Sequence, residues 1–370
     1  MESNLIPALD PAPLPGPPWL FHVLWVVTFL IHLLFVNTVL GGSLLAALAG
    51  LAGAGKREIQ SLFVEVNAWA ISFAITFGIA PLLFMQVLLG RFFYTATILV
   101  AWAWLGMLGL LMVGYYLNYV AKFRLRAGKG TGAVLIIEAA CFLVIAAIQV
   151  AINLLHMQPE RWVRVAEQAW AALADPTFGP RYVHFVLAAV AMSGALLAWV
   201  AVHRSAKGGD AQILSGMARF GVRAALVATL LQLVDGFWLL LTLPEDVLKA
   251  FMRGGPATMV PLTLGILAGV LLLVVLAQIA DPLANPTRVR RVAELMVGAV
   301  VFMVLTRHQL RTIYLAPARA NEQVTVAPQL GALALFLVVF VLCVALTVYA
   351  LVKAAKDRPQ AGEDAAEKQA

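Results

Sequence analysis

The chemistry that this sequence could perform rests mainly on its histidines. A neutral imidazole is a good axial ligand for haem iron, and a helical bundle can hold a porphyrin when two such side chains, or a histidine and a methionine, point inward from facing helices. A histidine inside a membrane also commonly bonds a carbonyl or hydroxyl group of a neighbouring helix, so for any one of them alone both interpretations stay open. The six histidines are His22, His32, His156, His184, His203 and His308.

The spacing of the first two histidines limits what they can do together. His22 and His32 are ten residues apart, which is ~15 Å along a helix and roughly 80° around it. They cannot ligate the same iron, so they would serve two haems, or one haem and one hydrogen bond. A covalently attached haem is not indicated, because the Cys-x-x-Cys-His motif is absent and the two cysteines, Cys141 and Cys343, fall in separate apolar stretches.

Long apolar helices must position these histidines. Hydrophobic residues make up 62% of the 370 positions, charged residues only 12%, and the mean hydropathy is +0.91, so the chain has too little polar surface for a water-soluble globule. Its apolar stretches repeatedly exceed the ~20 residues that cross a bilayer. The sequence predicts an all-α, polytopic transmembrane bundle of about nine helices, near 19–50, 61–89, 92–121, 132–156, 182–203, 217–243, 257–280, 291–313 and 328–353.

The order of these segments predicts three parts and one orientation. Residues 1–18 are expected to form a periplasmic N-terminal arm, 19–353 the transmembrane domain, and 354–370 a disordered cytoplasmic tail. Lys and Arg are retained on the cytoplasmic side of a membrane, and here they are concentrated in the odd-numbered connections and the tail. The N-terminus is therefore expected outside and the C-terminus inside, in a bacterial inner membrane. The net charge of +7 is then a topology signal, and no nucleic-acid partner is expected.

This topology puts five of the six histidines in the outer half or the centre of the membrane, and only His203 at the inner surface. Ionisable residues inside spans are costly and mark candidate functional sites. Arg181, Arg307 and Arg311 lie close in sequence to the histidines of the fifth and eighth spans, as donors to haem propionates would. Interfacial snorkelling explains the same arginines equally well. The one-sided set of histidines favours haem on the periplasmic side.

Other polar and small residues of the spans carry weaker signals. Gln232 and Asp235 could take part in a proton route or contact a quinone, although a structural hydrogen bond is favoured. Glu138 is expected near the inner end of its span, where water is close. The glycine steps at 41–42 and 106–109 predict close helix packing.

Two stretches resemble a known family. The stretch from His32 to Gly41, His-Leu-Leu-Phe-Val-Asn-Thr-Val-Leu-Gly, resembles the first helix of subunit I of cytochrome bd ubiquinol oxidases. Arg181-Tyr-Val-His184 is similar to that family's fifth helix, whose histidine is a ligand of the low-spin haem b. The resemblance implies that His184 is this ligand. It also implies that Met259, in Thr-Met-Val at the start of the seventh span, is the other ligand.

The sequence departs from the family at several positions. The family's third-helix glutamates are replaced by an apolar run over 100–113, and the link 244–256 is too short for the family's quinol-binding loop. Arg307-His308-Gln309 is similar to the family's Gly-Arg-Gln-Pro-Trp motif, but the glutamate ligand just upstream would fall in 302–305, which is apolar. The resemblance thus implies a cytochrome b subunit that keeps the low-spin haem site and a histidine at the second site.

These observations lead to three hypotheses about function. The first is an electron-transfer subunit, an oxidoreductase component with one to three haems b, that exchanges electrons between membrane quinone and a periplasmic c-type cytochrome or a second membrane subunit. The second is an oxygen-reducing terminal oxidase subunit in which His22 or His308 replaces the missing carboxylates. The third is a haem-free scaffold or transporter. The expected iron ligands are His184, Met259 and His32, and the other expected cofactor-binding residues are His22, His308, Arg307 and Arg181.

Overall fold

The computed structural model describes residues 6–9, 12–49 and 55–356, and regular structure in these residues is helical except for one isolated bridge. The described chain therefore belongs to the all-α class that the sequence predicts. Two short 3-10 turns, Pro159–Arg161 and Ala169–Leu173, flank α5. The α-helices are α1 (Pro18–Leu48), α2 (Lys56–Leu99), α3 (Ala101–Arg126), α4 (Gly132–Leu155), α5 (Trp162–Glu167), α6 (Phe178–Ser205), α7 (Ala211–Thr242), α8 (Glu245–Arg253), α9 (Pro256–Ala277), α10 (Pro286–Arg319) and α11 (Leu330–Lys356).

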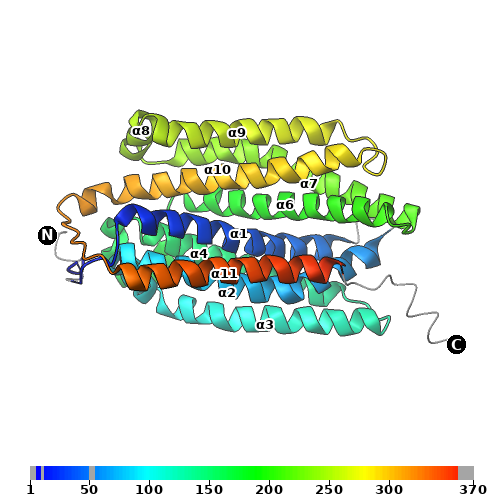
Figure 1. The fold of residues 1–370 in the computed structure, drawn as a ribbon, viewed down its shortest axis with the longest axis horizontal. Helices are drawn as coiled ribbons and strands as arrows, with labels where there is room; N and C mark the ends of the chain where they lie inside the picture. Colours follow the sequence, from blue (N-terminus) through cyan, green and yellow to red (C-terminus); the bar gives the residue numbers. More distant parts are fainter. Residues whose placement is uncertain (1–5, 10–11, 50–54, 357–370) are drawn as a thin grey trace. The chain divides into compact units, whose positions relative to one another are not determined.

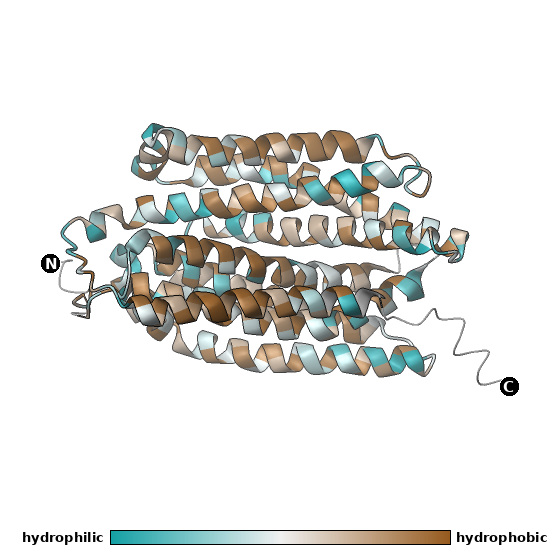
Figure 2. Cartoon of the chain, in the orientation of Figure 1, coloured by the Kyte–Doolittle hydropathy of each residue, from teal (hydrophilic) through white to brown (hydrophobic). Residues whose placement is uncertain are grey.

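Eight of these helices are long and apolar enough to cross a membrane, which makes the chain a multi-pass membrane protein. The predicted span at 291–313 lies in α10, which has 34 residues but is too polar for the same criterion. Figure 2 shows the contrast, since α9 is hydrophobic along most of its length whereas α10 carries several hydrophilic segments. Its polar residues therefore need partners within the bundle.

The border between the second and third predicted spans was placed about ten residues too early. α2 continues through Gly90 and Arg91 to Leu99, with a single interruption at Leu89 (φ −138°, ψ 24°). Arg91 lies between the predicted spans 61–89 and 92–121, and its guanidinium pairs with Glu322 and donates to the carbonyl oxygen of Pro7 at 3.0 Å. Because its charge is neutralised there, the helix can continue past it.

Close packing around α1 and between α6 and α7 depends on glycines. A Cβ atom added at Gly41 would lie 1.9 Å from the carbonyl oxygen of Ala189 on α6, and one at Gly42 would lie 2.7 Å from the ring of Phe63 on α2. The glycine step at 41–42 thus packs closely, as expected. The prediction for 106–109 is wrong within the described chain, because an added Cβ at either glycine of that step meets nothing within 4 Å.

A polar network links α1, α2 and α4 in the core. Glu138 was expected near water, but only 1% of its surface is exposed. Its Oε1 accepts a hydrogen bond from Ser43 Oγ at 3.2 Å, and Ser43 Oγ accepts one from Asn67 Nδ2 at 2.9 Å. Its Oε2 has no hydrogen-bond partner among the described residues. Packing of three helices has enclosed this acid.

The chain divides into two compact units. The first comprises 1–9 and 22–322, and within it α6, α7, α9 and α10 run side by side (Figure 1). The second comprises 10–21 and 323–370. In the second unit Leu14 pairs with the segment before α11: its amide donates to Thr325 at 2.9 Å and its carbonyl accepts from Ala327 at 2.9 Å. α11 runs three residues into the predicted tail, and 357–370 lie outside the described residues.

Candidate functional site

His184 is held between two side chains of α7. Helices α6 and α7 also pack closely at Gly194 and Gly221, about three turns along α6 from His184. The Nδ1 atom of His184 lies 3.0 Å from Oδ2 of Asp235, and its Nε2 atom lies 3.2 Å from Nε2 of Gln232. Gln232 and Asp235 are three residues apart and thus share one face of α7.

This arrangement fixes the tautomer of His184. A carboxylate only accepts hydrogen bonds, so the Nδ1 atom facing Asp235 carries the proton and Nε2 carries the lone pair. The amide of Gln232 then donates to that lone pair. Asp235 is 5% exposed, and its second oxygen, Oδ1, has no hydrogen-bond partner among the described residues.

His32 has the same tautomer for a similar reason. Its Nδ1 atom lies 2.8 Å from the carbonyl oxygen of Ala74 on α2. Since a carbonyl oxygen cannot donate, Nδ1 carries the proton and Nε2 the lone pair. The ring lies against Gly78, where a Cβ atom would come within 2.9 Å of Cε1 of the histidine. Glycine at this position makes room for the imidazole.

Three arginines gather where α10 meets α1, α4 and α6. Arg307 Nη2 donates to Oδ1 of Asn153 on α4 at 2.6 Å, and Arg311 Nη2 reaches the same oxygen at 3.5 Å. The guanidinium of Arg311 lies 4.3 Å from the ring centre of Trp25, and that of Arg307 lies 4.5 Å from the ring centre of Phe29. The third member, Arg181 on α6, lies 5.7 Å from the ring centre of Tyr314.

These arginines lack an anionic partner. Within the described part of the chain, no carboxylate lies within 4.0 Å of Arg181, Arg307 or Arg311, and every ion pair involves other cations. Nη2 of Arg181 and Nε of Arg311 also have no hydrogen-bond acceptor there. Taking an ion out of water costs several kcal/mol unless a counter-charge compensates. We therefore call Arg181, Arg307 and Arg311 the arginine cluster, and its chemistry calls for an anionic ligand.

Two further histidines lie at the arginine cluster. The rings of His22 on α1 and His308 on α10 are 5.2 Å apart, with 73° between their planes. The ring of Trp25 contacts that of His308 at 5.4 Å. His156 ends α4; its Nδ1 contacts the carbonyl oxygen of Ile152 at 3.2 Å, and its buried Nε2 has no hydrogen-bond partner among the described residues.

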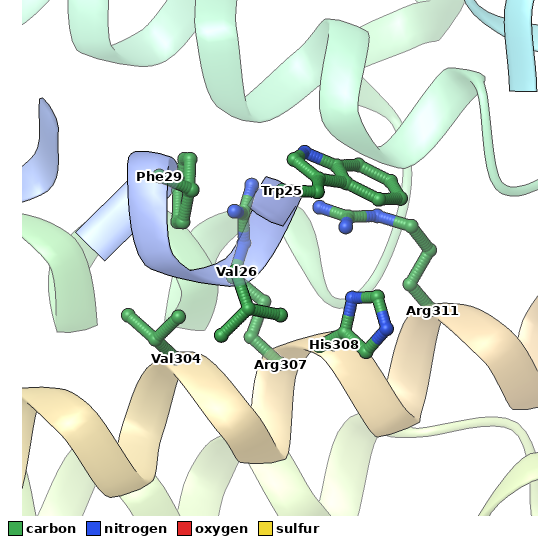
Figure 3. Close-up of a pocket in the computed structure, with 7 residues that line it drawn as sticks. All are labelled: Trp25, Val26, Phe29, Val304, Arg307, His308 and Arg311. Carbon is green, nitrogen blue, oxygen red and sulfur yellow. The ribbon is translucent and has the colours of Figure 1, made fainter. Parts of the chain in front are cut away.

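Little space is free beside the arginine cluster. A cavity there has a volume of about 10 Å³, roughly the room that one water molecule needs. Figure 3 shows its lining, with side chains of α1 facing those of α10. The site thus presents donors and charges, and anything larger than water needs these side chains to move. The lining residues are Trp25, Val26, Phe29, Val304, Arg307, His308 and Arg311.

The structure brings some of the predicted site residues together and not others. Arg181 and Arg307 both belong to the arginine cluster, and His22 and His308 lie beside it. Met259 packs in the first turn of α9 against a cluster that includes Leu310 and Tyr314, whereas both hydrogen-bond partners of His184 come from α7. The remaining histidine, His203, stacks on Trp199 of its own helix at the end of α6.

Sequence reasoning missed two contacts at the site. The pairing of Asp235 with His184 joins residues that had been considered separately, and the only signal for it was the presence of a carboxyl group inside an apolar span. Asn153, which accepts from both Arg307 and Arg311, had no distinguishing signal, because a single asparagine in a span is most often a helix-packing residue.

Comparison with known proteins supports the fold. The chain is similar to a solved structure described as "The structure of bd oxidase from Geobacillus thermodenitrificans", with a TM-score of 0.65 and 15% sequence identity over 93% of this chain and 99% of that chain. No protein-family model and no curated protein matches the sequence. The bd-oxidase-like fold is thereby shown, as the family resemblance had implied.

Proposed function

We propose that this chain is a haem b electron-transfer subunit of a respiratory membrane complex, working between membrane quinone and a periplasmic c-type cytochrome. The observation that carries the proposal is the hydrogen bonding of two histidine rings through their Nδ1 atoms. His184 and His32 each have a protonated Nδ1 bound to an oxygen acceptor, which leaves the lone pair on Nε2. Histidines that ligate metals are commonly oriented in this way, with the other ring nitrogen bonded to a carboxylate or a backbone carbonyl.

The charged residues near these histidines fit the same group. A haem carries two propionates, and the three guanidiniums of the arginine cluster, which form no ion pair within the described chain, are suitable donors to carboxylates. His184 and His32 would hold the iron, and Met259 is the second ligand to the His184 haem that the family resemblance implies. Arg181 and Arg307 would hold propionates, with His22 and His308 beside them. The haem would supply one-electron transfer.

A specific observation supports each alternative. The contact of 5.2 Å between His22 and His308 supports an oxygen-reducing subunit, in which one of these imidazoles would replace the carboxylate ligands that the sequence lacks. The small cavity at the arginine cluster and the hydrogen bond from Gln232 to Nε2 of His184 support a haem-free scaffold. Both alternatives place the chain in the bacterial inner membrane, with a second membrane subunit as a further partner.

The deciding experiment is a reduced-minus-oxidised visible spectrum of the purified protein, with haem quantified as the pyridine haemochrome. We expect a low-spin haem b signal that is lost in His184→Ala and a second haem signal that is lost in His32→Ala. His203→Ala is the matched control, because this histidine stacks on Trp199 away from the site, and it should keep both signals.

The outcomes separate the three functions. A second haem that binds carbon monoxide, together with oxygen consumption, would favour the oxidase. Purified wild-type protein without a Soret band would overturn the haem proposal and leave the scaffold.

A further inference from the structure

A second charged site lies where α2 begins and α3 ends, and it shares no residue with the arginine cluster. A groove of about 210 Å³ opens there between the two helices. Since a water molecule occupies ≈ 30 Å³ of liquid, this space has room for a phosphate group with part of its glycerol. The groove is lined by Arg57, Ser61, Val64 and Glu65 of α2 and by Lys122, Leu125 and Arg126 of α3.

The lining is positively charged. Arg57, Lys122 and Arg126 converge on the groove from both helices, and Glu65 is its one carboxylate. Within the described chain none of the three cations is in an ion pair with Glu65. Arg57 is held across the groove by a hydrogen bond of 2.7 Å from its Nη2 to the carbonyl oxygen of Leu125. The net charge of the lining therefore favours a monoanion or dianion.

The side chains beside the groove suit a lipid, because they are apolar and exposed. The groove adjoins the end of α3, where large aromatic side chains are exposed, including Tyr116 (69%) and Phe123 (62%). Tyrosines that are apolar on one side and polar on the other are typical of the membrane interface. Tyr119 also lies 5.9 Å from the ammonium group of Lys122. An anion bound here would thus have a charged end in the groove and apolar surface beside it.

We propose that this groove binds the phosphodiester headgroup of an anionic glycerophospholipid, with the acyl chains lying along the exposed face of α3. The charge distribution of the chain places these helix ends on the cytoplasmic side, where basic pockets between transmembrane helices bind such headgroups. A soluble phosphate would contact the cations but not the apolar face of α3, whereas a lipid would contact both. The proposal does not depend on haem.

The test uses the full chain, purified in dodecyl maltoside and stripped of lipid. Binding of phosphatidylglycerol is measured by native mass spectrometry and by the thermal unfolding midpoint, with phosphatidylcholine and inorganic phosphate as the other two ligands. We expect phosphatidylglycerol to bind and to raise the midpoint, and the other two to do neither. In the triple variant Arg57→Gln, Lys122→Gln, Arg126→Gln the affinity should fall about a hundredfold, because each basic residue near the membrane surface contributes about 1 kcal/mol.

A matched variant controls for general charge attraction. Lys207→Gln, Arg219→Gln, Arg223→Gln removes the same charge from exposed positions, one just after α6 and two in the first half of α7, and it should keep the affinity. Equal loss in both triple variants, no loss in the groove variant, or equal binding of inorganic phosphate would each overturn the proposal. If the groove variant does not fold, Lys122→Gln alone replaces it, because this side chain makes no hydrogen bond within the described fold, and it should still weaken binding severalfold.

Discussion

The pairing of Asp235 with His184 makes a quantitative prediction about the proposed haem. A carboxylate at 3.0 Å from Nδ1 increases the electron donation of the imidazole through Nε2, which favours ferric over ferrous iron. Replacing Asp235 by Asn keeps the shape and an acceptor oxygen but removes the charge. We therefore expect Asp235→Asn to raise the midpoint potential of the haem.

The size of this shift follows from hydrogen-bond energies. A bond to a charged group contributes ≈ 1.5–3 kcal/mol and a neutral one ≈ 0.5–1.5 kcal/mol, so the difference is about 1–1.5 kcal/mol. Only the part of this energy that differs between ferric and ferrous iron shifts the potential. For a one-electron couple a tenfold change in the equilibrium constant is 59 mV, so the shift is at most roughly 40–65 mV. Asp235 is almost fully buried, so solvent screens little of it.

Potentiometric titration of the reduced haem band measures the shift, and electron paramagnetic resonance of the ferric haem gives an independent signature of the ligand field. Thr229→Val is the matched control, because Thr229 is a buried residue on the same helix whose hydroxyl has no hydrogen-bond partner among the described residues. A normal haem content with an unchanged potential and spectrum in Asp235→Asn would refute the role of Asp235 without touching that of His184. Loss of all haem in the wild type would instead refute the proposed function.

Three further predictions concern stability and cofactor retention. Gly41→Ala places a Cβ atom 1.9 Å from the carbonyl oxygen of Ala189 and should destabilise the protein by about 3 kcal/mol. The control Gly109→Ala meets no atom within 4 Å and should be neutral or stabilising by roughly 0.5–1 kcal/mol. Unfolding in detergent measures both free energies, and equal effects would contradict the close packing at Gly41. Glu138→Gln should change the free energy of unfolding by less than about 1 kcal/mol because an amide can still accept from Ser43, while Glu138→Ala should cost ≈ 1–3 kcal/mol; a larger cost for Gln than for Ala would show that the acid is charged and paired. Arg307→Gln should lower haem affinity ten- to a hundredfold, the equivalent of a charge-assisted hydrogen bond of ≈ 1.5–3 kcal/mol, without loss of stability in the haem-free protein. Titration of haem into the haem-free protein measures the affinity, and an unaltered affinity would show that Arg307 does not bind the haem.

The sequence was sufficient to predict the fold class because a bilayer requires long apolar helices whose lengths can be counted directly. It was less reliable where a polar residue is neutralised by a distant partner. The predicted spans 61–89 and 92–121 left Arg91 in a connection, whereas it lies within α2 and its partner Glu322 is far away in sequence. Glu138 was placed near water because it lies near the inner end of its predicted span, although α1 and α2 cover it.

At the candidate site, too, the sequence predicted the residues but not their contacts. Residue types alone singled out His184, His32 and the arginines, since ionisable groups inside spans are few. They could not show that His184 faces Asp235, because that contact depends on how α6 packs against α7. The roles of these residues as haem ligands stay predictions until the spectra are measured.

The backbone pairing of Leu14 with residues 325–327 has a consequence for synthesis. Almost the whole described chain lies between its two partners, so a nascent polypeptide cannot close this pairing until the segment after α10 has left the ribosome. Loop closure over such a separation delays the contact relative to the helix pairs that form locally. The second unit is therefore completed last, after the segments that carry all six histidines have been synthesised.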